Sequence, residues 1–137
     1  MYLTRDLEAA KSYVHERYGE APEARYGLLA SARSQGFLPR FGVDSSWVAT
    51  RKVKLARWYN EPAGDPASCC ALTDVVTEFG CQGLELDLPI VCWGNALIWS
   101  GHGWWIRPVR SRYEMQNPDQ LRRNAYRVLL TQGSGVL

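Results

Sequence analysis

Apolar residues near the N-terminus recur at the spacing of a helix and then form one short unbroken run. The helical set comprises Leu7, Ala10, Tyr13, Val14 and Tyr18. Thr4 can cap such a helix through its hydroxyl and Asp6 suits its first turn, so we predict a helix over residues 5–18, ended by Gly19. The apolar run at residues 26–31 predicts a buried strand, and this alternation is typical of an α/β fold.

A second apolar run extends from Leu86 to Trp93 and is closed by Gly94. A run this short and this apolar predicts a strand buried on both faces of a sheet. Directly before it, residues 77–87 carry two glycines, a glutamine and several carboxylates. Because ligands bind at polar loops beside strand ends in open α/β sheets, this loop is a candidate site.

Residues 47–58 alternate loosely between apolar and polar positions, which predicts a strand or ribbon with one basic face. The basic residues of this segment are Arg51, Lys52, Lys54 and Arg57. Such a face can contact a phosphate backbone, or it can simply be solvated. Arg33, in the polar segment after the first strand, has the same two interpretations.

The remaining segments give weaker patterns. Ser68 can cap a helix over residues 69–79, in which Leu72, Val75, Val76 and Phe79 fall at helical intervals. Glycines around His102 predict a hairpin within residues 95–116. A helix is predicted from Asn117 to about residue 126. Its buried side would carry Leu121, Ala125 and Val128, and residues 128–131 would form the final strand.

Two of these segments resemble motifs of superfamily 1 helicases. The residues Gln-Gly-Leu-Glu-Leu-Asp at 82–87, followed by Ile-Val at 90–91, resemble motif V, and residues 124–133 resemble motif VI. Residues 2–10 and 25–31 are similar to the segments that open the second RecA-like lobe of the Schlafen-type (group 3) DNA/RNA helicase family. The likeness covers nearly the whole chain in the family's order, so it is more specific than any single motif. Because the family has a strand just before motif V, the resemblance changes the prediction for residues 69–79 to a helix-like start and an extended end over residues 74–79.

The resemblance implies a fold and a set of partners. The fold would be a single RecA-like helicase C-terminal lobe over residues 1–137, a three-layer α/β domain with a mostly parallel sheet flanked by helices. Residues 95–116 would be an insertion or hairpin loop. The family pattern continues into a further strand, so we expect a sheet truncated at the C-terminus. ATP and Mg would bind only together with a first RecA-like lobe, in cis or in trans, and single-stranded DNA or RNA is the expected strand partner.

The resemblance also implies roles for individual residues. The cofactor-binding set would be Gln82, Gly83, Glu85 and Arg127, and the nucleic-acid-binding set would be Thr77, Arg51, Lys52 and Lys54. Gly83 lets the backbone approach a phosphate or sugar closely, and Glu85 can accept a ribose hydroxyl. Gln132 stands where the family has its arginine finger, and a glutamine has no charge. The phosphate-loop signature is also absent from the 137 residues, so we expect no catalytic residue and a poor ATPase.

Composition restricts the class of protein. With 137 residues, 46% of them hydrophobic and 22% charged, the chain is an ordinary globular domain. A net charge of +2 does not by itself indicate nucleic-acid binding, which would need a local patch. There is no apolar stretch of about 20 residues and no leader-like N-terminus. We therefore expect a cytoplasmic protein without a membrane partner and with reduced cysteines.

Other interpretations stay open at this point. The four cysteines, Cys69, Cys70, Cys81 and Cys92, could bind a metal with His102, but they lack the close pair of zinc knuckles, and buried free thiols are the simpler interpretation. A cysteine nucleophile would need His15 or His102 close to a thiol. A nuclease centre built on Glu78, Glu85 and Asp87 lacks a following lysine.

The six tryptophans allow a further interpretation, because Trp104 and Trp105 could stack on bases or could serve as core and interface residues. Together with the basic segment they give the non-enzymatic alternative to a helicase lobe. This alternative is a non-catalytic module that binds nucleic acid or a protein.

Overall fold

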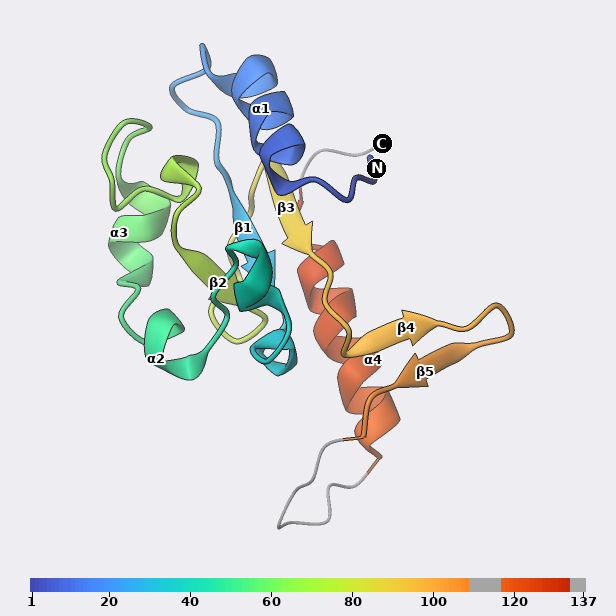
Figure 1. Cartoon of the computed structure of the whole chain (residues 1–137). Helices are drawn as coiled ribbons and strands as arrows, with labels where there is room; N and C mark the ends of the chain where they lie inside the picture. Colours follow the sequence, from blue (N-terminus) through green and yellow to red (C-terminus); the bar gives the residue numbers. More distant parts are fainter. Residues whose placement is uncertain (109–116, 134–137) are drawn as a thin grey trace.

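The computed structural model describes residues 1–108 and 117–133 of the chain (Figure 1). Its α-helices are α1 (Leu7–Tyr18), α2 (Trp47–Thr50), α3 (Leu55–Asn60) and α4 (Pro118–Leu130). Its strands are β1 (Tyr26–Ala30), β2 (Val75–Thr77), β3 (Leu88–Cys92), β4 (Leu97–Trp99) and β5 (Trp104–Ile106). Three short 3-10 helices, η1 (Ala32–Ser34), η2 (Leu38–Phe41) and η3 (Cys69–Ala71), connect them.

The centre of the molecule is a parallel sheet in the order β2-β1-β3. Every residue of β1 is buried, because it is the central strand of the sheet and helices pack on both of its faces. The residues of β3 are only half-buried, because β3 is the edge strand of this sheet in the described part of the chain. The prediction that this run is buried on both faces was therefore wrong, while the predicted mostly parallel α/β arrangement is confirmed for this small sheet.

Helices cover the two faces of β1. The ring of Tyr26 lies 5.7 Å from the His15 ring and 6.3 Å from the Tyr18 ring, both on α1. Side chains alternate along a strand, so a side chain at the next residue, Gly27, would face the opposite side of the sheet. There a Cβ would come within 2.7 Å of the Trp58 ring on α3. Gly27 therefore leaves room for a tryptophan that is only 1% exposed.

The first helix forms as predicted, but a different residue caps it. The Asp6 carboxylate accepts hydrogen bonds from the backbone N–H groups of Glu8 and Ala9, at 2.9 and 3.2 Å. Thr4 stands one step further out, and its hydroxyl accepts a bond from the N–H of Asp6. Both residue types are good caps, and the carboxylate also gains from the helix dipole.

The prediction of a strand or ribbon over residues 47–58 was wrong. This segment forms the short helices α2 and α3 instead. Ser46 caps α2, because its hydroxyl accepts a hydrogen bond from the N–H of Ala49 at 3.3 Å. Helices of four and six residues are too short to display a period of 3.6, so the sequence looked like loose alternation.

The segment over residues 69–79 has the predicted mixed character. Ser68 caps η3 through a 3.2 Å bond from the N–H of Cys70, and the chain is then extended in β2. Phe79, which helical spacing would have buried, is 78% exposed. The predicted extended end is therefore confirmed for Val75–Thr77, whereas residues 78–80 form a turn.

The last helix is longer than predicted. α4 continues to Leu130, so the predicted strand over residues 128–131 was wrong, and only an isolated parallel bridge joins Leu86 to Gly133. The buried side of the helix was also misassigned by one position. It carries Arg122, Tyr126 and Leu129, whereas Leu121 is 51% exposed.

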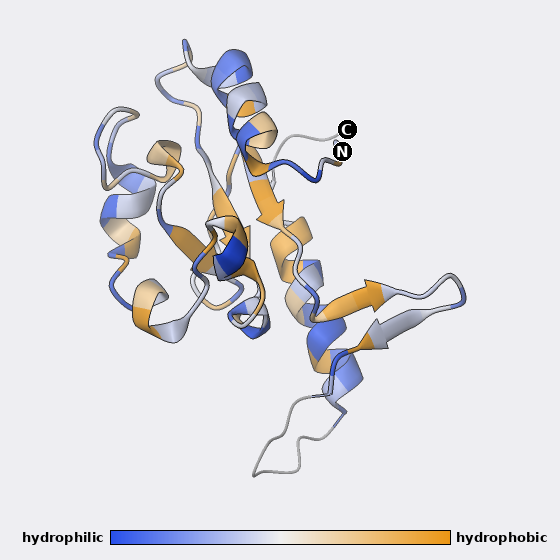
Figure 2. Cartoon of the chain, viewed as in Figure 1, coloured by the Kyte–Doolittle hydropathy of each residue, from blue (hydrophilic) through white to orange (hydrophobic). Residues whose placement is uncertain are grey.

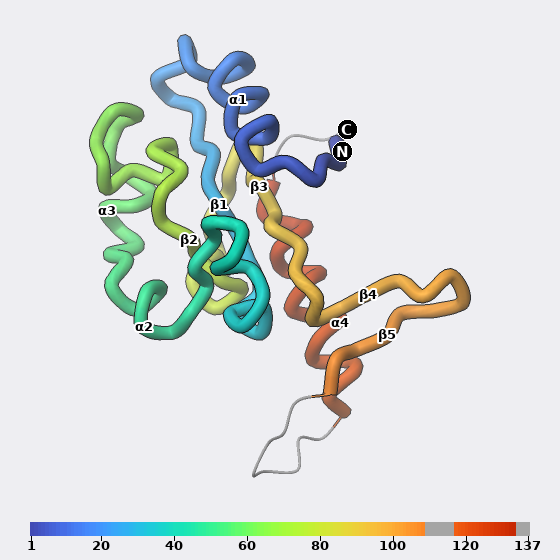
Figure 3. The backbone as a smooth tube through the Cα atoms, in the orientation of Figure 1, coloured from blue at the N-terminus to red at the C-terminus, as the bar shows by residue number. Residues whose placement is uncertain are grey.

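Strands β4 and β5 pair as an antiparallel hairpin, which projects away from the parallel sheet (Figure 3). Figure 2 shows that the parallel strands and β4 are hydrophobic, in contrast to the mixed surface of α4. That the hairpin is an insertion, and that the domain is RecA-like and three-layered, stay predictions. Within the described residues no helix is long and apolar enough to cross a membrane.

Candidate functional site

The carboxyl ends of β1 and β2 meet at one buried carboxylate, that of Glu78. Its side chain accepts a 2.9 Å hydrogen bond from the backbone N–H of Ala32 and a 3.4 Å bond from the Ser31 hydroxyl. Glu78 is only 5% exposed. Hydrogen bonds to a charged acceptor are stronger than neutral ones, so Glu78 fixes the chain that leaves β1 beside the chain that leaves β2.

A buried arginine lies close to this carboxylate. Arg122 of α4 is 6% exposed, and its Nε has no hydrogen-bond partner among the described residues. Burial, and then the like charge of Arg33, lower the pKa of the Arg122 guanidinium, while Tyr126 and Glu78 act in the opposite direction. Because the net shift is downward, nearby groups do not fully compensate this buried positive charge.

Tyr126, one turn after Arg122, connects α4 to η1, the short helix that follows β1, and lies beside Trp93 just beyond β3. Its hydroxyl lies 3.5 Å from the Ser34 hydroxyl, and burial raises the pKa of the Tyr126 phenol. Gly94, just beyond β3, packs directly on Ser34. A Cβ at Gly94 would collide with Ser34 Oγ and lie 2.5 Å from Ser34 Cβ.

An aromatic row, defined here as Tyr126, Trp93, Trp104 and Trp99, extends from this edge onto the hairpin. Ring centroids are 4.2 Å apart for Trp93 and Tyr126, 5.9 Å for Trp93 and Trp104, and 5.4 Å for Trp99 and Trp104. The indole N–H of Trp93 also donates a 2.8 Å hydrogen bond to the carbonyl of Leu97 in β4. Trp104 and Trp105 are 43% and 48% exposed, so neither is a core residue.

The loop that resembles motif V follows β2. Gln82 and Gly83 form an exposed turn, and Gly83 has a φ of 80°, which only glycine adopts without strain. The Glu85 carbonyl accepts a 2.8 Å hydrogen bond from the Tyr59 hydroxyl, and Glu85 itself is exposed. Asp87 has a structural role, because its carboxylate accepts a 2.6 Å hydrogen bond from the N–H of Arg25.

The structure brings the motif V loop next to the end of α4. The backbone N–H of Leu86 donates a 2.8 Å hydrogen bond to the carbonyl of Gln132, so Glu85 and Gln132 lie on adjacent segments. The Gln132 amide itself donates a 3.0 Å hydrogen bond to the Val128 carbonyl at the end of the helix. Arg127 lies exposed on α4 rather than on an extended strand. Cofactor binding by Gln82, Gly83, Glu85 and Arg127 stays a prediction.

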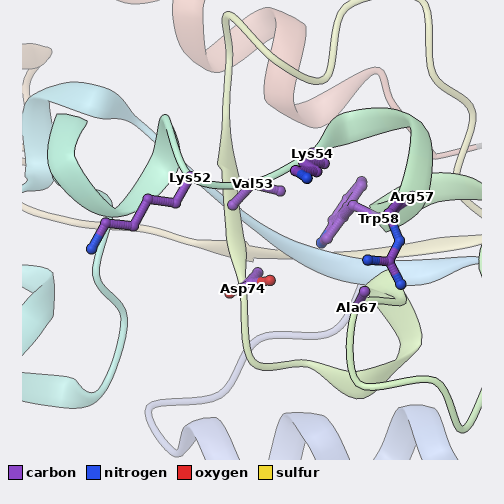
Figure 4. Close-up of a pocket in the computed structure, with 7 residues that line it drawn as sticks. All are labelled: Lys52, Val53, Lys54, Arg57, Trp58, Ala67 and Asp74. Carbon is purple, nitrogen blue, oxygen red and sulfur yellow. The ribbon is translucent and has the colours of Figure 1, made fainter.

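The residues predicted to bind nucleic acid do not share one face of a strand. Arg51 lies 4.5 Å from the ring centroid of Trp47. Lys52 and Lys54 line a pocket of about 220 Å³ with Arg57, Trp58 and Asp74 among others. Figure 4 shows that Lys52 extends away from the other lining side chains, so these cations do not converge.

Thr77 differs from those cations because it is the last residue of β2 and has a structural role. It is 7% exposed, and its carbonyl accepts hydrogen bonds from the N–H groups of Gly80 and Cys81, at 2.9 and 3.0 Å. These bonds shape the turn that begins the motif V loop. A nucleic-acid contact by Thr77, and by Arg51, Lys52 and Lys54, stays a prediction.

The described residues fit a nucleotide only in part. Gly83 and the exposed carboxylate of Glu85 suit a sugar, whose hydroxyls are hydrogen-bond donors. No three His, Cys, Asp or Glu side chains in the described ranges come together to hold a metal ion. The four cysteines are free, and burial raises the pKa of Cys81 to about 11.

Arg122 and Tyr126 were missed by the sequence analysis, and Glu78 was considered only as part of a nuclease centre. The sequence does contain a pattern that could have identified Arg122 and Tyr126. Arg122, Tyr126 and Leu129 follow the i, i+4, i+7 spacing of one helix face, but an arginine at its start hides the apolar stripe. Glu78 could be placed only by the pairing of β1 with β2, which the sequence does not specify.

Comparison with known families agrees with this arrangement of motifs. The model of the Schlafen group 3, DNA/RNA helicase domain matches residues 1–136. No curated protein and no solved structure gives a match. Since the family model covers nearly the whole chain, the protein belongs to the Schlafen group 3 DNA/RNA helicase domain family.

Proposed function

We propose that the chain acts as the second lobe of a helicase-type protein with a RecA-like fold. In this proposal it binds a single strand of DNA or RNA and completes a nucleotide site on an ATP-binding first lobe, in cis or in trans. It does not hydrolyse ATP by itself. The observation that carries the proposal is the hydrogen bond between Leu86 and Gln132, which holds the motif V loop against the end of α4.

This contact supports a site formed between lobes, because it places the exposed Glu85 beside the half-buried Gln132 that follows α4. The Glu85 carboxylate can accept hydrogen bonds from a ribose. Gly83, whose φ of 80° favours glycine, has no side chain to obstruct the approach. ATP would supply the transferable phosphoryl group when bound. The part that this chain plays is to bind and orient the sugar.

Gln132 supports the absence of turnover by the chain alone. Its amide is hydrogen-bonded to the Val128 carbonyl, and it has no charge to place on a phosphoryl group. An arginine finger raises the rate by roughly 10³- to 10⁵-fold. Even with a first lobe supplied, we expect hydrolysis slower than that of family members with arginine at this position.

The experiment mixes the chain with an ATP-binding first lobe of the family and measures nucleotide affinity by competition with a fluorescent analogue. Glu85→Gln should weaken ATP binding roughly tenfold or more, since a hydrogen bond to a charged group is lost. The matched control is a nucleotide that lacks both ribose hydroxyls, whose affinity should not change with this substitution. Equal losses for both nucleotides, or hydrolysis by the isolated chain, would refute the proposal.

A rate measurement on the same mixture tests the Gln132 argument. Gln132→Arg should increase ATP turnover by at least tenfold if the missing charge limits the reaction. Gln132→Met, which also removes the amide but adds no charge, is the control and should leave turnover unchanged. An arginine variant no faster than the methionine variant would contradict the argument.

A further inference from the structure

We propose that the three exposed tryptophans of the aromatic row, Trp93, Trp104 and Trp99, form a platform on which the bases of a single-stranded nucleic acid stack, and that Arg122 attracts the strand's phosphates near the buried Tyr126. This inference rests on the strand binding proposed above and gives that strand a location. The location differs from the basic segment of residues 51–54 that the sequence analysis favoured.

The first argument is the exposure of the row. Trp93, Trp104 and Trp99 are 39%, 43% and 57% exposed, although each of their rings also contacts another ring of the row. Rings held in place by neighbours lose little freedom when a base stacks on them. Since every base has a π-face, such a surface accepts a strand with little regard to sequence.

The register of the hairpin gives the platform one face. Trp99 is paired with Trp104 and Ile98 with Trp105. Because cross-strand partners point to the same side of a sheet and neighbours along a strand to opposite sides, Trp99 and Trp104 share one face. Trp105 lies on the other face and outside the aromatic row.

Charge is the second and independent argument, and it selects a nucleic acid over an apolar partner. Arg122 is one helical turn from Tyr126, the inner end of the row, and its buried Nε has no partner in the described part of the chain. Arg33 is close enough to lower the pKa of Arg122. Residues 93–108 contain no Asp or Glu and end beside the exposed Arg107. A polyanion with stacking groups matches this surface better than an apolar protein segment does.

The test measures the affinity of the whole chain for a labelled oligothymidine by fluorescence anisotropy at several salt concentrations. Trp99→Ala and Trp104→Ala should each weaken binding roughly five- to 150-fold, as expected for one lost stacking contact. Trp99→Phe should restore most of the affinity. Arg122→Met should weaken binding, and by a larger factor at low salt than at high salt, because it removes a positive charge near the strand.

Two tryptophans serve as matched controls. Trp105→Ala changes the opposite face of the same hairpin. Trp47→Ala removes a 67% exposed tryptophan on α2, which Figure 1 shows far from the hairpin. Both variants should bind as the wild type does, and circular dichroism should confirm that all variants are folded.

The outcomes separate this inference from the proposed function. If the wild type binds the strand, but Trp99→Ala and Trp104→Ala bind equally well while Lys52→Ala and Lys54→Ala do not, the platform is wrong and the strand-binding function stands. If the wild type does not bind at all, strand binding itself fails. A dimer that Trp99→Ala dissociates in sedimentation, with unchanged strand affinity, would assign the hairpin to self-association and overturn the inference.

Discussion

Arg122→Met should stabilise the free protein, although it removes a residue that we propose to be functional. Arg122 is 6% exposed with an unpartnered Nε, so its charge has lost much of its hydration. The lowered pKa of the guanidinium gives the sign. Tyr126 and Glu78 together raise the pKa less than burial and repulsion by Arg33 lower it, and the charged form is therefore less favourable in the folded state than in the unfolded state.

The expected change in the free energy of unfolding on Arg122→Met is the sum of three contributions. The effective desolvation penalty of a buried ion is several kcal/mol, and Met relieves it. The lost attraction to Glu78 offsets part of this gain. Met is unbranched and fills the space of the arginine stem, so repacking should cost less than about 1.5 kcal/mol. We expect a net increase of roughly 1–2 kcal/mol in the free energy of unfolding, within the range seen when buried charges are replaced by apolar residues.

Urea unfolding followed by tryptophan fluorescence measures this difference. With an m-value of about 2 kcal/mol/M, the midpoint should rise by roughly 0.5–1 M. Arg123→Met, at the exposed neighbouring position of α4, is the matched control and should change stability by less than about 0.5 kcal/mol. A midpoint that falls for Arg122→Met and is unchanged for Arg123→Met would mean that Arg122 is a paired, stabilising cation, and the reasoning would be refuted.

Two further predictions concern the packing and titration of buried groups. Gly94→Ala should lower the free energy of unfolding by roughly 1–3 kcal/mol, because the new Cβ collides with Ser34. In a Ser34→Gly background this loss should be smaller by about 1 kcal/mol or more. Additive losses in the double-mutant cycle would contradict the contact. Cys81 is fully buried, and burial raises its pKa from 9.0 to about 11. Stability from this raised pKa is complete below pH 9 and is lost as pH rises to about 11, by at most roughly 2.7 kcal/mol. Urea midpoints of the wild type and Cys81→Ala should therefore converge over that range, whereas parallel pH profiles would exclude an ionising Cys81.

The parts of the fold that could be predicted are those in which one physical signal dominates. The helix at α1 has a cap, an apolar stripe and a terminal glycine, and β1 is an apolar run between polar loops. The prediction of a strand over residues 47–58 failed because α2 and α3 are shorter than the window in which a helical period can be recognised. The burial of β3 was overestimated because an apolar strand looks the same in the centre and at the edge of a sheet.

The candidate site could be predicted only in part, for a related reason. The motif V loop is continuous in the sequence, so its resemblance to a helicase motif marks Gln82, Gly83 and Glu85 directly. The neighbourhood of Glu78 and Arg122 is assembled from three elements that are distant in the sequence. Its components depend on strand order and on the rotation of α4, and neither can be derived from local periodicity.

Position along α4 connects the two proposals. The buried Arg122 and Tyr126 lie in the first half and just past the middle of the helix, while Gln132 follows its end, beside the chain that enters β3. A strand on the aromatic row and a nucleotide at Glu85 would therefore lie at different positions along one helix. If the proposed function holds, the uncharged Gln132 stands where hydrolysis would need a positive charge, whereas Arg122 is a charge that stays buried despite its expected cost in stability. This difference is expected of a lobe that retains strand binding and depends on another polypeptide segment for chemistry.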